Sequence, residues 1–220
     1  MTLVIFDCDG VLVDSEVLFA RVMAEVLSDC GYAIDTETAI ARFTGISTPS
    51  MVAEIEAEWG RPLPEDFVQR CRARADTLFD GELQAVDGID AVLDAHAPRR
   101  CVASSSSPAR IRRSLHSTGL ARHFADETLF SAAMVDRGKP APDLFLYAAA
   151  EMGAAAADCI VIEDSVPGVT AAVAAGMTVL GFAGASHIRD GHAARLHETG
   201  VARVFETMAE LPALLAGFAE

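Results

Sequence analysis

The sequence predicts an α/β fold in which a doubly wound parallel sheet carries an inserted domain of four helices. From residue 81 onward, short apolar runs alternate with segments of helical periodicity, the pattern of a parallel sheet with helices on both faces. An apolar run at residues 3–6 opens the chain and has the composition of a buried strand. Residues 16–79 show helical periodicity throughout, so they interrupt the alternation directly after that strand.

This interruption predicts the division into domains. We expect residues 1–15 to supply the first core strand, residues 16–79 to form a helical domain and residues 80–220 to form the rest of the core. A chain of 220 residues with 51% hydrophobic content is long enough for one sizeable core with a smaller insert.

The periodicity also places each element in order along the chain. The first helix of the insert follows Asp14 and ends at Gly31, and three more are expected at 35–43, 48–59 and 64–79. The expected strands are 3–6, 100–104, 128–131, 159–163, 178–182 and 202–205. The expected core helices are 108–117, 143–152, 166–175, 192–199 and 208–218.

The composition argues against several classes of protein. The 32 acidic residues outnumber the 17 basic ones, so the net charge is −15 and no basic surface for nucleic acid is expected. No apolar run approaches the length that crosses a membrane, and no basic leader precedes the first strand. Five dispersed cysteines without a CxxC pair indicate a reducing compartment, and we expect the cytoplasm. The composition does not fix an oligomeric state.

Polar side chains follow four of the expected strands. Asp7 and Asp9 come after the first strand, and a serine run at 104–107 ends the second. GKPAPD, with Lys139, follows the third strand, and an acidic pair at 163–164 ends the fourth. Because ligands of open α/β sheets bind beyond the carboxyl ends of the strands, we expect these side chains to meet at one edge.

This set of side chains suits phosphoryl transfer. Carboxylates are hard oxygen ligands for Mg²⁺, while Ser104 at a helix start and Lys139 suit phosphate oxygens. One carboxylate can attack phosphorus and a second can protonate the leaving oxygen. Asp7 and Asp9 are two residues apart, so the chain must leave strand geometry for both to reach one substrate. Gly10 supplies the backbone freedom for that turn.

Together these motifs resemble those of the haloacid dehalogenase-like (HAD) hydrolases that carry a helical cap of the C1 type. The motifs, in the family's order, are DCDGVLVDSE at 7–16, ASSSS at 103–107, GKPAPD at 138–143 and VIEDSVPGVTAAVAAGM at 161–177. The resemblance implies a Rossmann-like core with the inserted helices as a cap over the site. It also implies Mg²⁺ as the cofactor and a small phosphorylated metabolite as the substrate.

The resemblance implies a role for each residue of the phosphate site. Asp7 would be the nucleophile and Asp9 the general acid and base. Ser104 and Lys139 would bind the transferring phosphoryl group, with Ser105 as a further substrate contact.

The metal ligands are implied in the same way. Mg²⁺ would be held by Asp7, the carbonyl of Asp9 and Asp164. Glu163 would be a further ligand or a partner of the ligands.

Departures from related branches narrow the expected reaction. The dehalogenase branch lacks a counterpart of Asp9, which favours phosphoryl transfer here. The β-phosphoglucomutase-like branch has a histidine where Phe19 stands, and Lys and Arg around the cap loop that here carries Thr44 and Thr48. The two threonines are expected to contact the substrate.

LFDGELQAVDGI at 78–89 and ARFTGIS at 41–47 more closely resemble the motifs of sugar-phosphate phosphatases of the 6-phosphogluconate type. We expect a hydrolase that acts on a small sugar phosphate or sugar-acid phosphate through an aspartyl-phosphate. A sugar phosphomutase and a phosphoglycolate phosphatase are the alternatives, and a binding module without catalysis would be expected to lose one of the motif residues. Three histidines at 187, 192 and 197 are expected on the solvated surface, with a zinc site as the alternative. Arg110 is also expected on the surface, with an approach to the phosphate site as the alternative.

Overall fold

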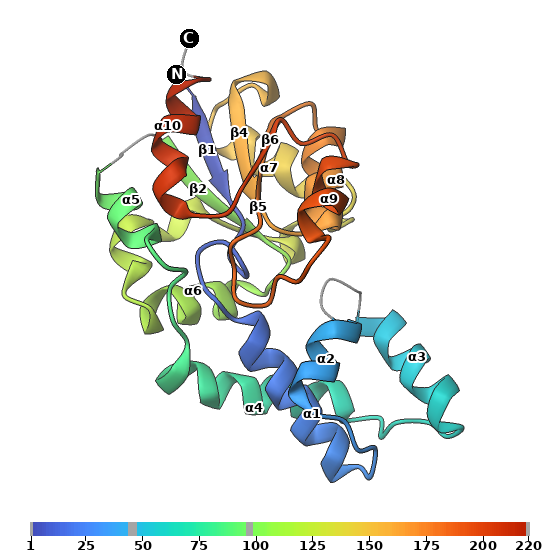
Figure 1. Ribbon diagram of the computed structural model, residues 1–220. Helices are drawn as coiled ribbons and strands as arrows, with labels where there is room; N and C mark the ends of the chain where they lie inside the picture. Colours follow the sequence, from blue (N-terminus) through green and yellow to red (C-terminus); the bar gives the residue numbers. More distant parts are fainter. Residues whose placement is uncertain (1, 44–47, 96–98, 219–220) are drawn as a thin grey trace.

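A parallel sheet forms the core of the computed structural model, which describes residues 2–43, 48–95 and 99–218 (Figure 1). Within these residues six strands pair in the order β3–β2–β1–β4–β5–β6, and every pair is parallel. The strands are β1 Leu3–Phe6, β2 Arg99–Ser104, β3 Leu129–Ser131, β4 Cys159–Glu163, β5 Thr178–Phe182 and β6 Arg203–Phe205. The expected parallel sheet is confirmed.

The strand order reverses between β1 and β4. The chain runs outward from β1 through β2 and β3, crosses back, and continues through β4, β5 and β6. Phe6 at the end of β1 lies opposite Val102 on one side and Ile162 on the other. Such a reversal opens a crevice beyond the carboxyl ends of the strands, which is where the polar motifs of the sequence lead.

Helices cover both faces of the sheet because successive strand residues point to opposite faces. Val4 and Phe6 belong to one hydrophobic cluster, and Leu3 and Ile5 belong to another. The first cluster includes residues of α5 Ile89–Ala95, α6 Pro108–Ser117 and α10 Leu211–Ala216. The second includes residues of α7 Asp143–Glu151, α8 Val166–Ala174 and α9 His192–His197. This two-sided cover confirms the doubly wound architecture.

The inserted helices form a separate lobe beyond the carboxyl ends of the strands (Figure 1). They are α1 Glu16–Asp29, α2 Thr36–Phe43, α3 Thr48–Trp59 and α4 Phe67–Glu82. Helices α1 and α4 connect the lobe to the core, and α4 packs against α6 of the core. The lobe therefore stands over the edge of the sheet at which the polar motifs end.

The observed elements depart from the expected ones in a few places. Helix α5, Ile89–Ala95, was not expected, because a seven-residue helix shows too little periodicity to be recognised. Helix α4 begins at Phe67 and continues to Glu82, a shift toward the carboxyl side of its expected span. The last expected helix is divided into a short 3₁₀ turn, Met208–Glu210, and α10, which has proline in its first turn.

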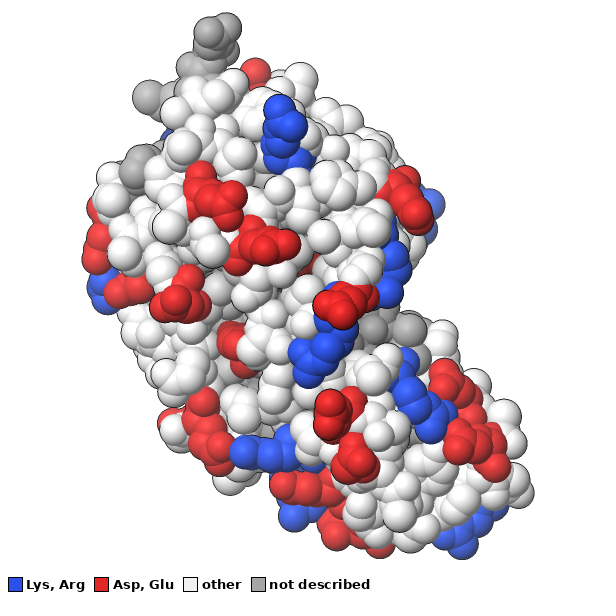
Figure 2. Space-filling view, viewed as in Figure 1, with Lys and Arg blue, Asp and Glu red and all other residues white. Residues whose placement is uncertain are grey.

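The distribution of charge on the surface agrees with the composition. Acidic and basic side chains are interspersed on the face shown in Figure 2, which carries no broad basic patch. None of the helices in the described ranges is long and apolar enough to span a membrane.

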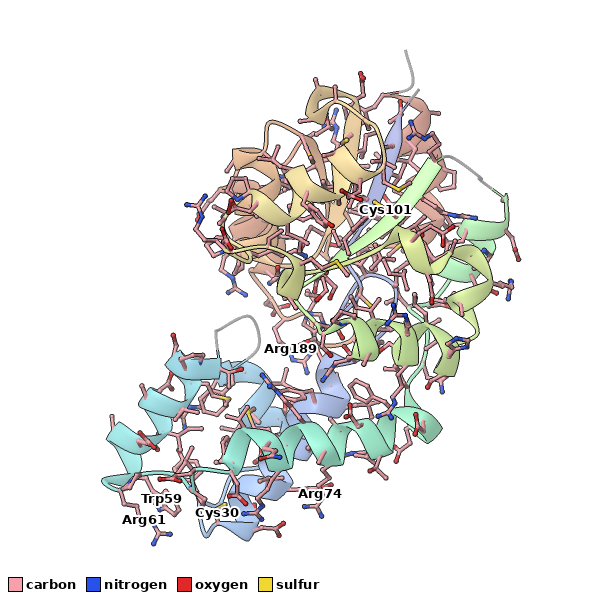
Figure 3. All side chains as sticks on the ribbon, turned by 180° about the vertical axis from the view of Figure 1, so that it is seen from behind. Cys30, Trp59, Arg61, Arg74, Cys101 and Arg189 are labelled. Atoms are coloured by element: carbon pink, nitrogen blue, oxygen red, sulfur yellow. The ribbon has the colours of Figure 1, made fainter. Side chains whose placement is uncertain are left out.

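Figure 3 shows Trp59 and Arg61 at the end of the lobe away from the core, where the guanidinium lies 3.6 Å from the indole centroid. This pair stabilises the lobe and does not face the core.

Candidate active site

A tight turn after β1 brings Asp7 and Asp9 together. The Asp7 amide still donates to the carbonyl of Ile162 in β4 at 3.0 Å, and the Gly10 amide then donates to the carbonyl of Val13 at 2.8 Å. Gly10 has a φ of +85°, which glycine adopts at little cost. A Cβ atom at Gly10 would lie 2.1 Å from Oδ2 of Asp164, so this position also needs the absence of a side chain. The expected role of Gly10 is confirmed.

A buried lysine links two of the carboxylates. Nζ of Lys139 lies 2.9 Å from Oδ1 of Asp7 and 2.7 Å from Oε1 of Glu163. The Lys139 side chain is 4% exposed and that of Glu163 is fully buried. Burial by itself lowers the pKa of Lys139, but the carboxylates of Asp7 and Glu163 outweigh burial and raise it above its ordinary value. Lys139 is therefore a fixed positive charge at the end of β1.

Glu163 is held on both of its carboxylate oxygens. Oε1 accepts from Lys139, while Oε2 accepts from the amide of Ser165 at 2.8 Å and from its hydroxyl at 2.9 Å. The same hydroxyl accepts from the amide of Gly168 and caps α8, as expected for a serine at a helix start. Glu163 thus connects Lys139 to the beginning of α8.

Gly168 leaves room for this carboxylate, and its replacement by alanine should be strongly destabilising. A Cβ atom there would lie 1.7 Å from Oε1 of Glu163, a buried side chain that cannot move away. We expect Gly168→Ala to lower the free energy of unfolding by about 2–4 kcal/mol. The matched control is Gly81→Ala in α4, where nothing lies within 4 Å and alanine favours a helix. Urea unfolding of both variants measures the difference, and equal stability would contradict this packing.

Two histidines contact Asp164, the residue that follows Glu163 in the chain. His187 is 4% exposed, and its Nε2 lies 3.2 Å from Oδ2 of Asp164. Nε2 of His192 donates to the backbone carbonyl of Asp164 at 2.6 Å. Burial lowers the pKa values of His187 and His192, which favours their neutral forms. The expectation that His187 lies on the solvated surface is wrong, because the loop after β5 folds back over the end of β4.

The carboxylates of Asp7, Glu163 and Asp164 form a buried acidic cluster. One oxygen from each lies within 4.8 Å of the others. Burial raises the pKa of Asp7 well above its ordinary value, although Lys139 opposes the shift. Burial, and after it the carboxylate of Glu163, raises the pKa of Asp164. Oδ1 of Asp164 is buried and has no partner in the part of the chain that the structure describes. A donor set of this kind fits a divalent cation, which favours ionised carboxylates.

A second group with metal-ligand side chains lies away from this edge. Asp90, Asp94 and His123 have ligand atoms within 4.8 Å of one another. Nη2 of Arg122 lies 2.9 Å from Asp90 and 2.8 Å from Asp94, so a guanidinium already matches these charges. The buried cluster is the better candidate.

Asp9 lies in a different environment, lined by hydroxyl groups. Its Oδ1 accepts from the hydroxyl of Ser15 at 2.6 Å, and its Oδ2 accepts from that of Ser106 at 2.7 Å. Oγ of Ser104 lies 3.5 Å from Oδ2 and accepts from the amide of Ser106. Ser105 is exposed, so Ser106 is the serine of the run that enters the site beside Ser104. The sequence contained Ser15 and Ser106 within its motifs but did not indicate which hydroxyl groups point inward.

Two further charged residues border Asp9. Arg110 places Nη2 3.7 Å from Oδ1 of Asp9, in agreement with the alternative that it approaches this site. Glu16 at the start of α1 is half-buried; burial, and after it the charge of Asp9, raises its pKa to about 7, while His187 and Arg110 oppose the shift. Arg189 also lies at the junction of the core and the lobe (Figure 3), where it donates to carbonyl groups of its own loop.

The structure describes one of the two threonines that are expected to contact the substrate. Thr48 opens α3 in the lobe and is half-buried. Thr44 lies outside the residues that the structure describes.

Comparison with known proteins identifies the family. The family model described as "haloacid dehalogenase-like hydrolase" matches residues 1–176. The chain belongs to this family. A 6-phosphogluconate phosphatase of Escherichia coli is 34% identical over 185 residues, which cover 84% of this chain and 83% of that protein. The HAD chain is thus an enzyme, a phosphatase of this family.

Solved structures agree with this assignment. A HAD-like protein of unknown function from Agrobacterium tumefaciens has a TM-score of 0.91 and 39% identity, with 100% of both chains covered. A HAD family hydrolase from Deinococcus radiodurans with bound phosphate and sodium has a TM-score of 0.83 and 35% identity, with 99% of this chain and 96% of that chain covered. The HAD-like core predicted from the sequence is confirmed.

Proposed function

We propose that the chain is a Mg²⁺-dependent phosphomonoester hydrolase that acts on a small sugar phosphate or sugar-acid phosphate through an aspartyl-phosphate intermediate. The observation that carries the proposal is the contrast between two carboxylates at one turn. Asp7 is buried against Lys139 at 2.9 Å, while Asp9 is 17% exposed and accepts hydroxyl hydrogen bonds. Such a pair suits two different roles in one reaction.

The roles follow from these environments. Asp7, whose ionised form Lys139 favours, attacks phosphorus, and the ester oxygen leaves with the proton of Asp9. Asp9 then takes a proton from water, whose oxygen attacks the phosphorus and releases inorganic phosphate and the free Asp7 carboxylate. Lys139 and Ser104 hold the phosphoryl oxygens, with help from the amides at the start of α6.

The intermediate has a direct test. A reaction quenched in acid should contain a peptide with Asp7 that has gained the mass of one phosphoryl group. The same peptide from Asp7→Asn protein should lack this mass gain. A gain on another residue, or an equal gain in the variant, would contradict the proposed nucleophile.

Mg²⁺ fits the buried acidic cluster. Asp7 and Asp164 would hold the cation together with the Asp9 carbonyl, and Oδ1 of Asp164 is a buried oxygen that has no partner in the described ranges. Both oxygens of Glu163 already accept hydrogen bonds, which favours its role as a partner of the ligands. When bound, the cation neutralises charge on the phosphoryl group.

His187 should set the affinity for the cation because it fixes the orientation of Asp164. We expect His187→Ala to weaken Mg²⁺ binding by about 10- to 100-fold, since partners of metal ligands contribute to that extent. The matched control is His197→Ala, an exposed histidine at the end of α9. Calorimetric titration with Mg²⁺ measures both affinities without turnover, and an unchanged affinity in His187→Ala would contradict this role.

The proposed substrate class rests on the relatives and on the lobe. The Escherichia coli relative is a 6-phosphogluconate phosphatase, and the Deinococcus radiodurans structure has bound phosphate. Phe19, half-buried near the site, takes the place of the histidine of the mutase branch, which favours release of phosphate over its return to the sugar. Five free cysteines, four of them buried, favour a reducing compartment, the cytoplasm.

We assign residues 16–79 to a cap domain whose loop between α2 and α3 helps to select the substrate. The substitution Thr48→Val should change the ratio of kcat/KM between two sugar phosphates by about 5-fold or more. The reason is that a hydroxyl group of the substrate loses its hydrogen bond to the Thr48 hydroxyl. Its Mg²⁺ requirement should stay the same. The control is Thr77→Val, an exposed threonine of α4, and an unaltered substrate profile in Thr48→Val would contradict the role of this loop.

A further inference from the structure

Arg110 lies beside Asp9 and has no task in the reaction described above. It is the third residue of α6, and its side chain is 18% exposed. The 3.7 Å between its Nη2 and Oδ1 of Asp9 is an ion-pair distance, but longer than a hydrogen bond. Its Nε is buried and has no partner in the part of the chain that is described. The guanidinium therefore has donor groups that the protein itself does not use.

Two phenylalanines of the cap hold this guanidinium in place. Its central carbon lies 4.5 Å from the ring centroid of Phe79 in α4 and 5.6 Å from that of Phe19 in α1. These contacts stabilise the cation without hydrogen-bonding any N–H group. Arg110 is thus fixed at the joint between cap and core, with its donors still available.

The position of Arg110 relative to Asp9 suggests what it would meet. Ser104, on the phosphate side, approaches Oδ2 of Asp9, whereas Arg110 approaches Oδ1. In the proposed first step Asp9 is protonated and faces the leaving oxygen. Arg110 then lies next to the leaving group.

We propose that Arg110 binds an oxyanion carried by the leaving group, which is a carboxylate or a second phosphate. Arg110 then selects substrates with this second anionic group, here called doubly anionic substrates, over monophosphates of neutral polyols. This inference rests on the proposed function and names the substrate class of that site. The planar fork of a guanidinium matches both oxyanions, which accept two parallel hydrogen bonds from it.

The test compares substrates that differ in one group. 6-Phosphogluconate and glucitol 6-phosphate differ by a carboxylate in place of a hydroxymethyl group, and fructose 1,6-bisphosphate and fructose 1-phosphate differ by one phosphate. We expect Arg110→Gln to lower kcat/KM by about 30- to 100-fold for the preferred doubly anionic substrate. For the counterpart that lacks the second anionic group, the loss should be less than about 5-fold. Arg110→Lys, which keeps the charge and loses the fork, should give an intermediate loss. A selective loss within the 6-phosphogluconate pair would identify a carboxylate as the group that Arg110 binds, and a selective loss within the fructose phosphate pair would identify a second phosphate.

The matched control is Arg113→Gln. Arg113 lies one turn further along α6 and pairs with Asp76 at 3.4 Å and Asp80 at 3.6 Å in α4, so it contacts the cap and does not contact Asp9. Its loss should change kcat/KM for both members of a pair by the same factor. If Arg110→Gln also lowers kcat/KM equally for both members, or leaves both unchanged, Arg110 does not bind the leaving group and the inference is overturned.

A binding measurement separates this inference from the proposed function. Calorimetric titration of wild-type and Arg110→Gln protein with the same four compounds, in chelator so that the proposed Mg²⁺-dependent reaction does not proceed, measures binding without turnover. A selective loss of affinity for a doubly anionic compound would support the role of Arg110 even if no phosphate were released. Equal affinities of the two proteins for all four compounds would overturn it even if the phosphatase reaction were demonstrated.

Discussion

Replacement of Asp7 with asparagine should reduce phosphate release by at least about 10⁴-fold and leave the fold intact. An amide is a poor nucleophile, and the loss of a nucleophile that acts with its partners removes most of the rate enhancement. The side chain keeps its size, and Lys139 keeps its second partner, Glu163. Turnover of the best substrate measures the first effect, and circular dichroism with thermal unfolding measures the second.

The control for this variant is Asp158→Asn, an exposed aspartate just before β4 that should retain full activity. Turnover near the wild-type value in Asp7→Asn would refute the assignment of the nucleophile. Loss of folded structure in Asp7→Asn would instead show that the carboxylate is needed for the stability of the core.

The second large effect is expected for Lys139→Met. Lys139 is the chain's only lysine, and its loss leaves Asp7 and Glu163 buried without their cation. We expect turnover to fall by at least about 10³-fold, because the phosphoryl group loses a fixed positive charge. We also expect the free energy of unfolding to fall by about 3–5 kcal/mol, as for other buried ion pairs that lose one partner.

The pH dependence of that destabilisation provides a check on its cause. Burial raises the pKa of Asp7 in the folded chain, and the variant loses Lys139, which opposes this shift. A raised carboxyl pKa stabilises the folded state at low pH, and this contribution is lost as the pH rises through the folded-state value. Urea unfolding in chelator should therefore show a larger destabilisation at pH 7.5 than at pH 5. An equal destabilisation at both values would mean that packing, rather than charge, accounts for the loss.

The sequence predicted the sheet and its polar edge because both depend on local patterns. Buried strands such as Leu3–Phe6 are apolar throughout, and the order of strands and helices then brings the strand ends together. Asp7, Lys139 and Glu163 were expected to meet on this basis, and in the structure the Lys139 ammonium lies 2.9 Å from Asp7 and 2.7 Å from Glu163. The roles given to them remain a proposal.

The contacts that the sequence did not predict all depend on how separate loops pack. His187 reaches Asp164 because the loop after β5 folds over the end of β4, and the regular spacing of the histidines contains no sign of that. Ser106, rather than Ser105, points to Asp9 because the serine run turns into α6. Arg110 resembles the other arginines of α6 in sequence, and only the tertiary fold places it between Asp9 and Phe79.

Release of inorganic phosphate from a panel of phosphorylated metabolites, with Mg²⁺ and with chelator, tests the central claim most directly. The panel contains 6-phosphogluconate, hexose and pentose phosphates, phosphoglycolate and β-glucose 1-phosphate. We predict strong release from one sugar phosphate or sugar-acid phosphate that requires Mg²⁺ and disappears with chelator. Conversion of β-glucose 1-phosphate to its 6-isomer without phosphate release would contradict the account and identify a mutase.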